Sequence, residues 1–168
     1  MPAPALLPRA ARLGLKVTAA LAFVAPLLTR ITMGHAFFLT GRGKLANFDN
    51  TVEFFASQNI PFPALNAAFV SRLEYYGGML LIAGLLTRVV ALLLGSTMVV
   101  ALMTADRADF RAALFNTGEK GLTDVVPVVY LLFLLWLLIA GPGAVSLDAL
   151  LKRWLLPTSA APHPARAA

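Results

Sequence analysis

The sequence predicts an all-α fold: an integral membrane four-helix bundle with a short extracytoplasmic amphipathic helix and a C-terminal interfacial helix. The first observation is composition, since 59% of the 168 residues are hydrophobic and 13% are charged, against about 45–50% and 25% in a soluble domain. The second is a mean hydropathy of +0.78. The third is that apolar residues gather in four runs. Because a bilayer solvates apolar surface, all three observations favour a membrane protein.

The first predicted span covers residues 17–39 and carries one formal charge, at Arg30. A helix of this length extends about 34 Å, enough to cross a hydrocarbon core of roughly 30 Å. A secretory signal peptide is the alternative, because Arg9, Arg12 and Lys16 precede the run. The run exceeds the roughly 7–15 apolar residues of such a signal and no small-x-small site closes it, so an uncleaved span is favoured.

Three further apolar runs are expected to be spans. They cover residues 67–86, 89–105 and 125–140. A tight polar turn at Thr87 and Arg88 separates the second run from the third. The Gly-Pro-Gly sequence at 141–143 stops the fourth run, because neither residue type continues a helix well.

The distribution of Lys and Arg predicts the orientation of these spans. With four spans, both termini lie on the same side of the membrane. We expect an N-terminal tail (1–15) and a disordered, Pro/Ala-rich C-terminal tail (157–168) on that side. The membrane domain (16–156) lies between the two tails. The basic residues on that side are Arg9, Arg12, Lys16, Arg88, Lys152, Arg153 and Arg166. Those on the other side are Arg42, Lys44, Arg107, Arg111 and Lys120, and acidic residues oppose them there. By the positive-inside rule, both termini are predicted to be cytoplasmic.

Two short amphipathic helices are expected outside the bilayer core. In the first loop, Asn50 and Glu53 have the spacing of a capping box, which predicts a helix through residues 54–56 on the extracytoplasmic surface. After the fourth span, Ser146 is placed to cap a helix that runs through Trp154. Its apolar face and neighbouring basic residues predict an interfacial anchor.

Two charged residues lie inside the predicted spans at similar depth. Arg30 is about 13 Å below the outer end of the first span, and Glu74 is about 10 Å below the outer end of the second. An isolated charge near a span centre costs roughly 2.5–3.5 kcal/mol on insertion scales, and pairing offsets that cost. We therefore predict a buried ion pair between Arg30 and Glu74 on adjoining helices. Its role is either to fix helix packing or to form a polar pocket.

Other residues are assigned to the pocket and to the helix contacts. The predicted pocket lining is His35, Phe37, Lys44, Tyr75 and Asp124. The predicted packing positions, where small residues let membrane helices approach closely, are Gly34, Gly77, Gly78 and Gly84. No metal site is predicted, because no two acids within a span have ligand spacing.

Several functional classes are excluded by composition and motif. The chain has no cysteine, which excludes thiol relays, disulfides and thiolate metal sites. Histidine ligation of haem from both sides is disfavoured, because the second histidine, His163, lies in the tail. The net charge of +6 gathers in the termini and indicates topology rather than nucleic-acid binding. No hydrolytic triad, phosphate loop or dinucleotide fingerprint is present.

Four segments, in order, are similar to a known family. They are RITMGHAFFLTGRGKL, FFASQNIPFP, EYYGGMLLIAGLLTRVVAL and GPGAVSLDALL. Together, over roughly residues 25–151, they resemble the DoxX family of small four-span bacterial inner-membrane proteins. Within the family pattern, the resemblance aligns the Arg of the first span with Arg30, the following Gly-x-x-Lys with Gly41 and Lys44, and the Glu-x-x-Gly-Gly with the segment at 74–78.

The resemblance implies a redox function. Name-giving members of the family are linked to a thiosulfate:quinone oxidoreductase as a membrane subunit, and relatives join complexes that handle oxidative or thiol stress. We therefore expect a membrane subunit of a redox-linked complex, with a quinone as the candidate cofactor, no covalently bound cofactor, and a soluble or periplasmic redox partner. The alternatives are a non-catalytic structural or assembly protein, and a small permease acting as a homo-oligomer. The lack of cysteine argues against direct thiol chemistry.

Overall fold

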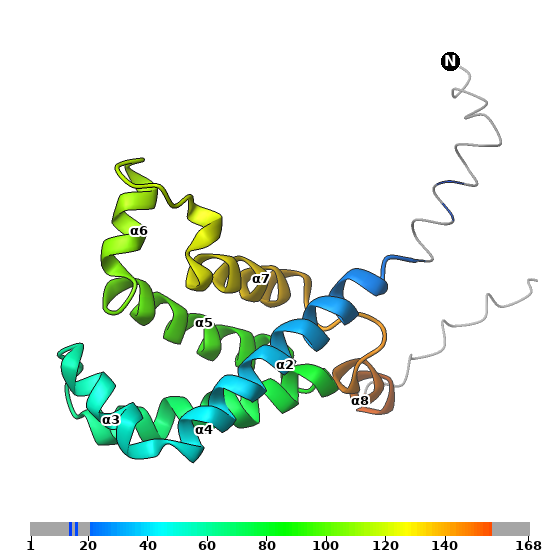
Figure 1. Ribbon diagram of the computed structural model, residues 1–168. Helices are drawn as coiled ribbons and strands as arrows, with labels where there is room; N and C mark the ends of the chain where they lie inside the picture. The colour runs from blue at the N-terminus through cyan, green and yellow to red at the C-terminus, as the bar shows by residue number, and fades with distance from the viewer. Residues whose placement is uncertain (1–13, 15, 17–20, 156–168) are drawn as a thin grey trace, which may run out of the picture.

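The computed structural model describes residues 14, 16 and 21–155, and these form an all-helical fold (Figure 1). Over the described residues there are seven α-helices, one short 3-10 helix and no strands. The predicted all-α class is therefore confirmed. The predicted C-terminal tail and the predicted N-terminal tail, apart from Gly14, lie outside the described residues.

The helices overlap the predicted runs but differ from them at their ends. Their bounds are α2 Val24–Ala46, α3 Phe48–Ser57, α4 Pro63–Ala83, α5 Thr87–Met103, α6 Arg107–Leu114, η1 Leu122–Asp124, α7 Val126–Ala140 and α8 Leu147–Leu155. The expected capping box at Asn50 is wrong, because α3 begins at Phe48 and its N-cap is Asn47. Ser146 does cap α8, since its Oγ accepts a hydrogen bond from the Ala149 N–H at 3.1 Å.

The largest difference is at the end of α2, which continues to Ala46 rather than ending near Leu39. Two glycines, Gly41 and Gly43, lower the intrinsic helix propensity of this stretch. Tertiary contact outweighs that preference, because a Cβ added to Gly41 would overlap the backbone of Tyr75 on α4. The close approach of the two backbones therefore keeps the last two turns of α2 helical.

The turn between α4 and α5 is built from residues in the left-handed region. Gly84 ends α4 with φ +70°, and Leu86 precedes α5 with φ +51°. Glycine is the favoured residue for the first of these positions, because it has no Cβ to clash. At the opposite end, Pro63 occupies the first turn of α4, where no backbone N–H is needed.

The four long helices α2, α4, α5 and α7 meet at one hydrophobic core (Figure 1). Antiparallel α2 and α4 make the most extensive contact between described elements, and α5 packs mainly on α7. At the α2–α4 crossing, a Cβ on Gly34 would lie 2.6 Å from the Gly78 carbonyl oxygen. Gly77 instead faces α5, where a Cβ would meet Val90. The buried apolar residues of the core are Met33, Phe37, Leu81, Val90, Ala91, Leu94, Leu134 and Leu137.

The outward faces of the same helices are also apolar. Large side chains are exposed on α2, α5 and α7, for example Leu28 at 57%, Leu92 at 58% and Ile139 at 70%. By contrast, Arg30 and Glu74 are each only 1% exposed. A soluble domain has the opposite arrangement, with apolar residues inside and charges outside.

No single helix of the described part reaches both the length and the hydropathy used to recognise a membrane span. Taken together, α5 and α6 reach that standard as a bent pair with an angle of 83° between them.

The sequence analysis predicts no helix in the loop that follows α6. It contains η1, and an ion pair joins it to α6, with the Lys120 ammonium 2.6 Å from an Asp109 carboxylate oxygen. This hydrogen bond raises the pKa of Lys120, because Asp109 stabilises the charged form. Both side chains are about half exposed, so the pair contributes little to stability.

The α2–α4 crossing generates a prediction about two glycines of the same helix. Gly34→Ala should lower the free energy of unfolding by about 1–3 kcal/mol, because the new Cβ forces the two backbones apart. Gly43→Ala is the control, because nothing lies within 4 Å of its Cβ position, and it should raise stability by about 0.5–1 kcal/mol through helix propensity. Thermal unfolding followed by circular dichroism measures both. Equal stabilisation by the two substitutions would contradict the close contact.

Candidate functional site

A cavity of about 230 Å³ lies where α3, the start of α4 and the end of α5 surround the C-terminal turn of α2. Its lining is mostly apolar and aromatic, with a few polar groups, as is usual for ligand pockets. The aromatic residues are Phe54, Phe55 and Phe69. The polar residues are Lys44, Asn66, Glu74, Ser96, Thr97 and Thr104.

An ion pair between Lys44 and Glu74 is the charged feature of this cavity. The Lys44 Nζ lies 2.5 Å from Glu74 Oε1. The Glu74 side chain is 2% exposed, whereas that of Lys44 is 32% exposed. The second carboxylate oxygen, Glu74 Oε2, is buried and has no hydrogen-bond partner among the described residues. The cavity wall therefore contains an ammonium donor beside a carboxylate that has one buried, unpaired oxygen.

The register of α2 against α4 brings these two groups together. Gly41 lies against the backbone of Glu74 and Tyr75, and Lys44 follows Gly41 by nearly one helical turn. Lys44 also lies in the last turn of α2, where the helix dipole favours a positive charge. The extension of α2 past Leu39 is thus what carries a cation to the carboxylate.

The predicted ion pair between Arg30 and Glu74 is not formed, and this prediction is wrong. Glu74 pairs with Lys44, while Arg30 Nη2 donates to the Val145 carbonyl oxygen at 2.6 Å. The similar depths predicted for Arg30 and Glu74 depend on a first span that ends at Leu39 and a second span that begins at residue 67. In the structure, Arg30 lies beside Gly84, ten residues beyond Glu74 on the α4 side, which is about 15 Å of helix.

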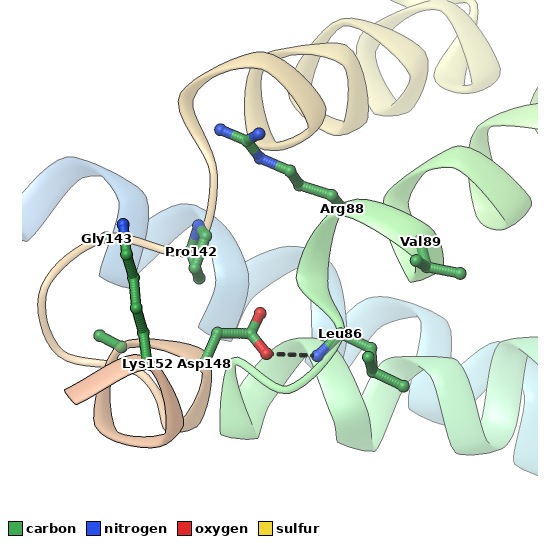
Figure 2. Close-up of a pocket in the computed structure, with 8 residues that line it drawn as sticks. Leu86, Arg88, Val89, Pro142, Gly143, Asp148 and Lys152 are labelled. Carbon is green, nitrogen blue, oxygen red and sulfur yellow. Dashed lines mark hydrogen bonds between the residues drawn. The ribbon is translucent and has the colours of Figure 1, made fainter. Parts of the chain in front are cut away.

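Arg30 instead joins three segments at the other end of the molecule. Its guanidinium packs against Gly84, where the absence of a side chain leaves room for it. Asp148, at the start of α8, acts on Arg30 electrostatically. Asp148 also accepts hydrogen bonds from the N–H groups of Leu86 at 2.8 Å and Thr87 at 3.0 Å, the first of which is drawn in Figure 2. Arg30 and Asp148 therefore hold α8 to the α4–α5 turn.

The remaining predicted lining residues lie away from the cavity. His35 is exposed on α2, and Phe37 is buried in the core with its ring 5.4 Å from that of Tyr130. Tyr75 stacks on Phe38 with ring centroids 5.0 Å apart. Asp124 is exposed and accepts a hydrogen bond from the Gly121 N–H at 2.8 Å. Of the predicted lining, Lys44 contacts the cavity.

Sequence reasoning missed the contributions of α3 and α5 to the cavity. Ser96 and Thr97 lie on α5, and Thr104 is the residue that follows its last turn. These hydroxyls in a mostly apolar segment were a usable signal. The sequence predicts an amphipathic surface helix through Phe54 and Phe55, and in the structure Phe55 is only 8% exposed on this helix, α3. The described residues hold no group of three or more side chains suited to binding a metal ion.

The pairing of Lys44 with Glu74 predicts unequal effects of removing either partner. Lys44→Met should lower the free energy of unfolding by about 2–3 kcal/mol, because it leaves a buried carboxylate without a counter-charge. Glu74→Gln should cost only about 1 kcal/mol, because the partly exposed ammonium can turn to water. The control is the double variant Lys44→Met/Glu74→Met, which should recover most of the loss. Denaturant titration of the purified variants measures these values, and equal costs for the two single variants would contradict the pairing.

Comparison with known proteins identifies relatives over most of the chain. The inner membrane protein YqjF of Escherichia coli (strain K12) is 31% identical over 78% of this chain and 95% of its own length. The inner membrane protein YphA of the same organism is 30% identical over 73% of this chain and 86% of its own length. A Bacillus subtilis (strain 168) protein named "Putative oxidoreductase CatD" is 35% identical over 48% of this chain, and the match spans 59% of that protein.

No solved structure matches this chain. The model of the family described as DoxX matches residues 25–107, which include nearly all of α2 and the whole of α3, α4 and α5. With this match and the near full-length likeness to YqjF, the chain belongs to the DoxX family.

Proposed function

We propose that this chain is a multi-pass protein of the bacterial inner membrane, with α2, α4, α5 and α7 crossing the bilayer as a bundle and both termini in the cytoplasm. The observation that carries this is the apolar outer surface of helices whose interior holds the charges. An exposed apolar surface of this extent is characteristic of membrane contact. The printed names of YqjF and YphA, both inner membrane proteins, support the same location.

The two ends of the molecule support this orientation. Arg88, Lys152 and Arg153 gather at the end formed by the α4–α5 turn and α8. On α8, Trp154 is 83% exposed and lies beside these cations, which suits an interfacial helix on the cytoplasmic surface. The cavity with Lys44 and Glu74 is at the opposite, extracytoplasmic end.

Within the membrane, we infer that the cavity binds the head of a quinone and that the chain is the membrane subunit of a quinone-linked oxidoreductase. The residues fit such a ring, because Lys44 can donate to a carbonyl oxygen and Phe54, Phe55 and Phe69 supply apolar contact. At about 230 Å³ the cavity is smaller than the usual 300–1,000 Å³ ligand pocket. It therefore suits a single ring, with an isoprenoid tail leaving past the exposed Phe69 and Val100.

A quinone, when bound, would supply the capacity to accept electrons and protons. Lys44 would hold the ring by its carbonyl oxygen. Glu74 Oε2, which has no partner in the described structure, would accept a hydrogen bond from a hydroxyl of the reduced, quinol form of the ring. The chain has no cysteine to act as a thiol donor, so electrons would come from a soluble or periplasmic partner. The name of CatD is consistent with a redox role.

The alternative is a membrane structural or assembly protein without redox chemistry of its own. The placement of Arg30 favours this reading, because a buried cation within the spans serves to hold α8 and the α4–α5 turn. In that case the Lys44–Glu74 pair would hold α2 to α4 in the same way. Binding measurements distinguish the two functions.

A cavity-filling substitution tests quinone binding. Ala101→Phe should weaken binding of a short-chain ubiquinone more than tenfold, because the new ring occupies the space that the quinone needs. Lys44→Met should weaken it about tenfold, the value of a charge-assisted hydrogen bond. Equilibrium dialysis of the purified full-length protein measures both. The matched control is Leu92→Phe, an exposed position on the same helix, which should bind as the wild type does. Undetectable binding by the wild type, or equal binding by all variants, would favour the structural alternative.

The absence of native cysteine allows a direct test of topology. Ser57→Cys after the first span and Thr117→Cys after the third should react with a membrane-impermeant maleimide in intact spheroplasts. Ala144→Cys, in the linker before α8, should react only after lysis. All three positions are exposed, so reactivity reports the side of the membrane. Labelling of Ala144→Cys in intact spheroplasts would contradict the orientation.

A further inference from the structure

A second hollow lies at the opposite end of the molecule from the Lys44–Glu74 cavity. It is an open groove of about 490 Å³ between the α4–α5 turn, the linker from α7 to α8, and α8 itself (Figure 2). Neither Arg30 nor any residue of the Lys44–Glu74 cavity lines it. We call this hollow the basic groove, because the cations Arg88 and Lys152 line it.

The two cations come from different elements and extend toward the same linker. Figure 2 shows Arg88 at the first turn of α5 and Lys152 on α8, with Pro142 between them. Arg88 Nη2 donates to the Ile139 carbonyl oxygen at 3.2 Å, and this hydrogen bond fixes the guanidinium group. The other N–H groups of the Arg88 guanidinium have no partner in the described structure. Lys152 makes no ion pair with any described residue. Two cations held apart in this way suit a phosphate group between them.

The acidic residue of the basic groove does not neutralise these cations. Both carboxylate oxygens of Asp148 accept backbone hydrogen bonds, from Leu86 and Thr87, so the carboxylate points into the turn (Figure 2). Its electrostatic partner is Arg30, which lies outside the groove. Arg88 and Lys152 therefore remain available to an anion from outside the protein.

An apolar groove continues from the basic groove along the outer surface. Leu86 and Val89 line both hollows. This apolar α4–α5 groove, of about 530 Å³, runs between α4 and α5 and is lined on α4 by residues from Leu65 to Leu80. Fifteen residues of helix extend about 22 Å, which exceeds the roughly 15 Å depth of one leaflet. The one charged residue of this lining is Arg72, whose Nη1 donates to the Ala68 carbonyl oxygen at 3.0 Å. An acyl chain beginning at Leu86 and Val89 thus has a mostly apolar surface to follow.

We propose that this pair of grooves binds an anionic glycerophospholipid from the cytoplasmic leaflet. The phosphate lies between Arg88 and Lys152, and one acyl chain follows the α4–α5 groove. The ligand class follows from the charge and from the adjoining apolar path, since a free phosphate would use only the basic groove. This inference goes beyond the quinone site and relies only on the proposed membrane location.

Native mass spectrometry of the full-length protein in neutral detergent tests the proposal. Phosphatidylglycerol and phosphatidylcholine with the same acyl chains are titrated separately. We expect the wild type to bind phosphatidylglycerol more tightly. Lys152→Gln and Arg88→Gln should each weaken that binding about fivefold, because this is the contribution of one basic residue to the affinity for an anionic surface. The matched control is Arg153→Gln, the same helix and charge change outside the groove, which should bind as the wild type does.

A second pair of variants tests the acyl path. Leu93→Trp fills the α4–α5 groove and should weaken phosphatidylglycerol binding several-fold, whereas Leu92→Trp, the adjacent residue outside the groove, should not. Inorganic phosphate is added as a competitor to separate a free anion from a lipid head. Displacement of the lipid by millimolar phosphate, equal binding of the two lipids, or equal effects of Lys152→Gln and Arg153→Gln would each overturn the proposal. Quinone dialysis and cysteine labelling do not depend on Arg88, Leu93 or Lys152, so this failure is distinguishable from theirs.

Discussion

The close antiparallel contact of α2 with α4 is the constraint on which both ends of this structure depend. Small residues at the crossing let the backbones approach, with Gly34 against Gly78 and Gly41 against Tyr75. Once these contacts set the register, each later pairing follows. Lys44 lies beside Glu74 at one end, and Arg30 lies beside Gly84 at the other. Larger side chains at the crossing would separate the helices and disrupt both the Lys44–Glu74 contact and the Arg30–Gly84 contact.

The two buried charges are both only partly hydrogen-bonded, and their positions separate structure from candidate function. Arg30 donates from Nη2 to the Val145 carbonyl oxygen and lies near Asp148, whereas its Nε and Nη1 are buried without a hydrogen-bond partner among the described residues. Glu74 binds Lys44 through one carboxylate oxygen and lines the cavity, and its other oxygen has no partner among the described residues. A buried acceptor without a partner is costly, and its position on a cavity lined by aromatic rings makes a ligand the natural partner. The quinone proposal therefore depends on Glu74 rather than on Arg30.

The two hollows divide the molecule into ends with different chemistry. The Lys44–Glu74 cavity is smaller and less open than the basic groove and is mostly apolar, and its two charges largely cancel. The basic groove is open and keeps uncancelled positive charge, because Asp148 is committed to the α4–α5 turn. This contrast matches the proposed orientation, in which an anionic leaflet faces Arg88 and Lys152. A lipid held there would also contact the turn that Arg30 and Asp148 stabilise.

The sequence by itself determined the all-helical class, the family, and the presence of two charges that need burial, because composition, apolar runs and ordered motifs are local properties. It also identified Gly34 and Gly78 as small residues between helices and Ser146 as a helix cap. Only the tertiary structure decided which charges meet. The predicted Arg30–Glu74 pairing was wrong because the end of an apolar run does not mark the end of a helix. The stretch with Gly41 and Gly43 stays helical because it packs on α4. The cavity walls contributed by Phe55 and Thr97 come from elements far apart in the chain, and their meeting depends on helix register, which is set by side-chain contacts across the core.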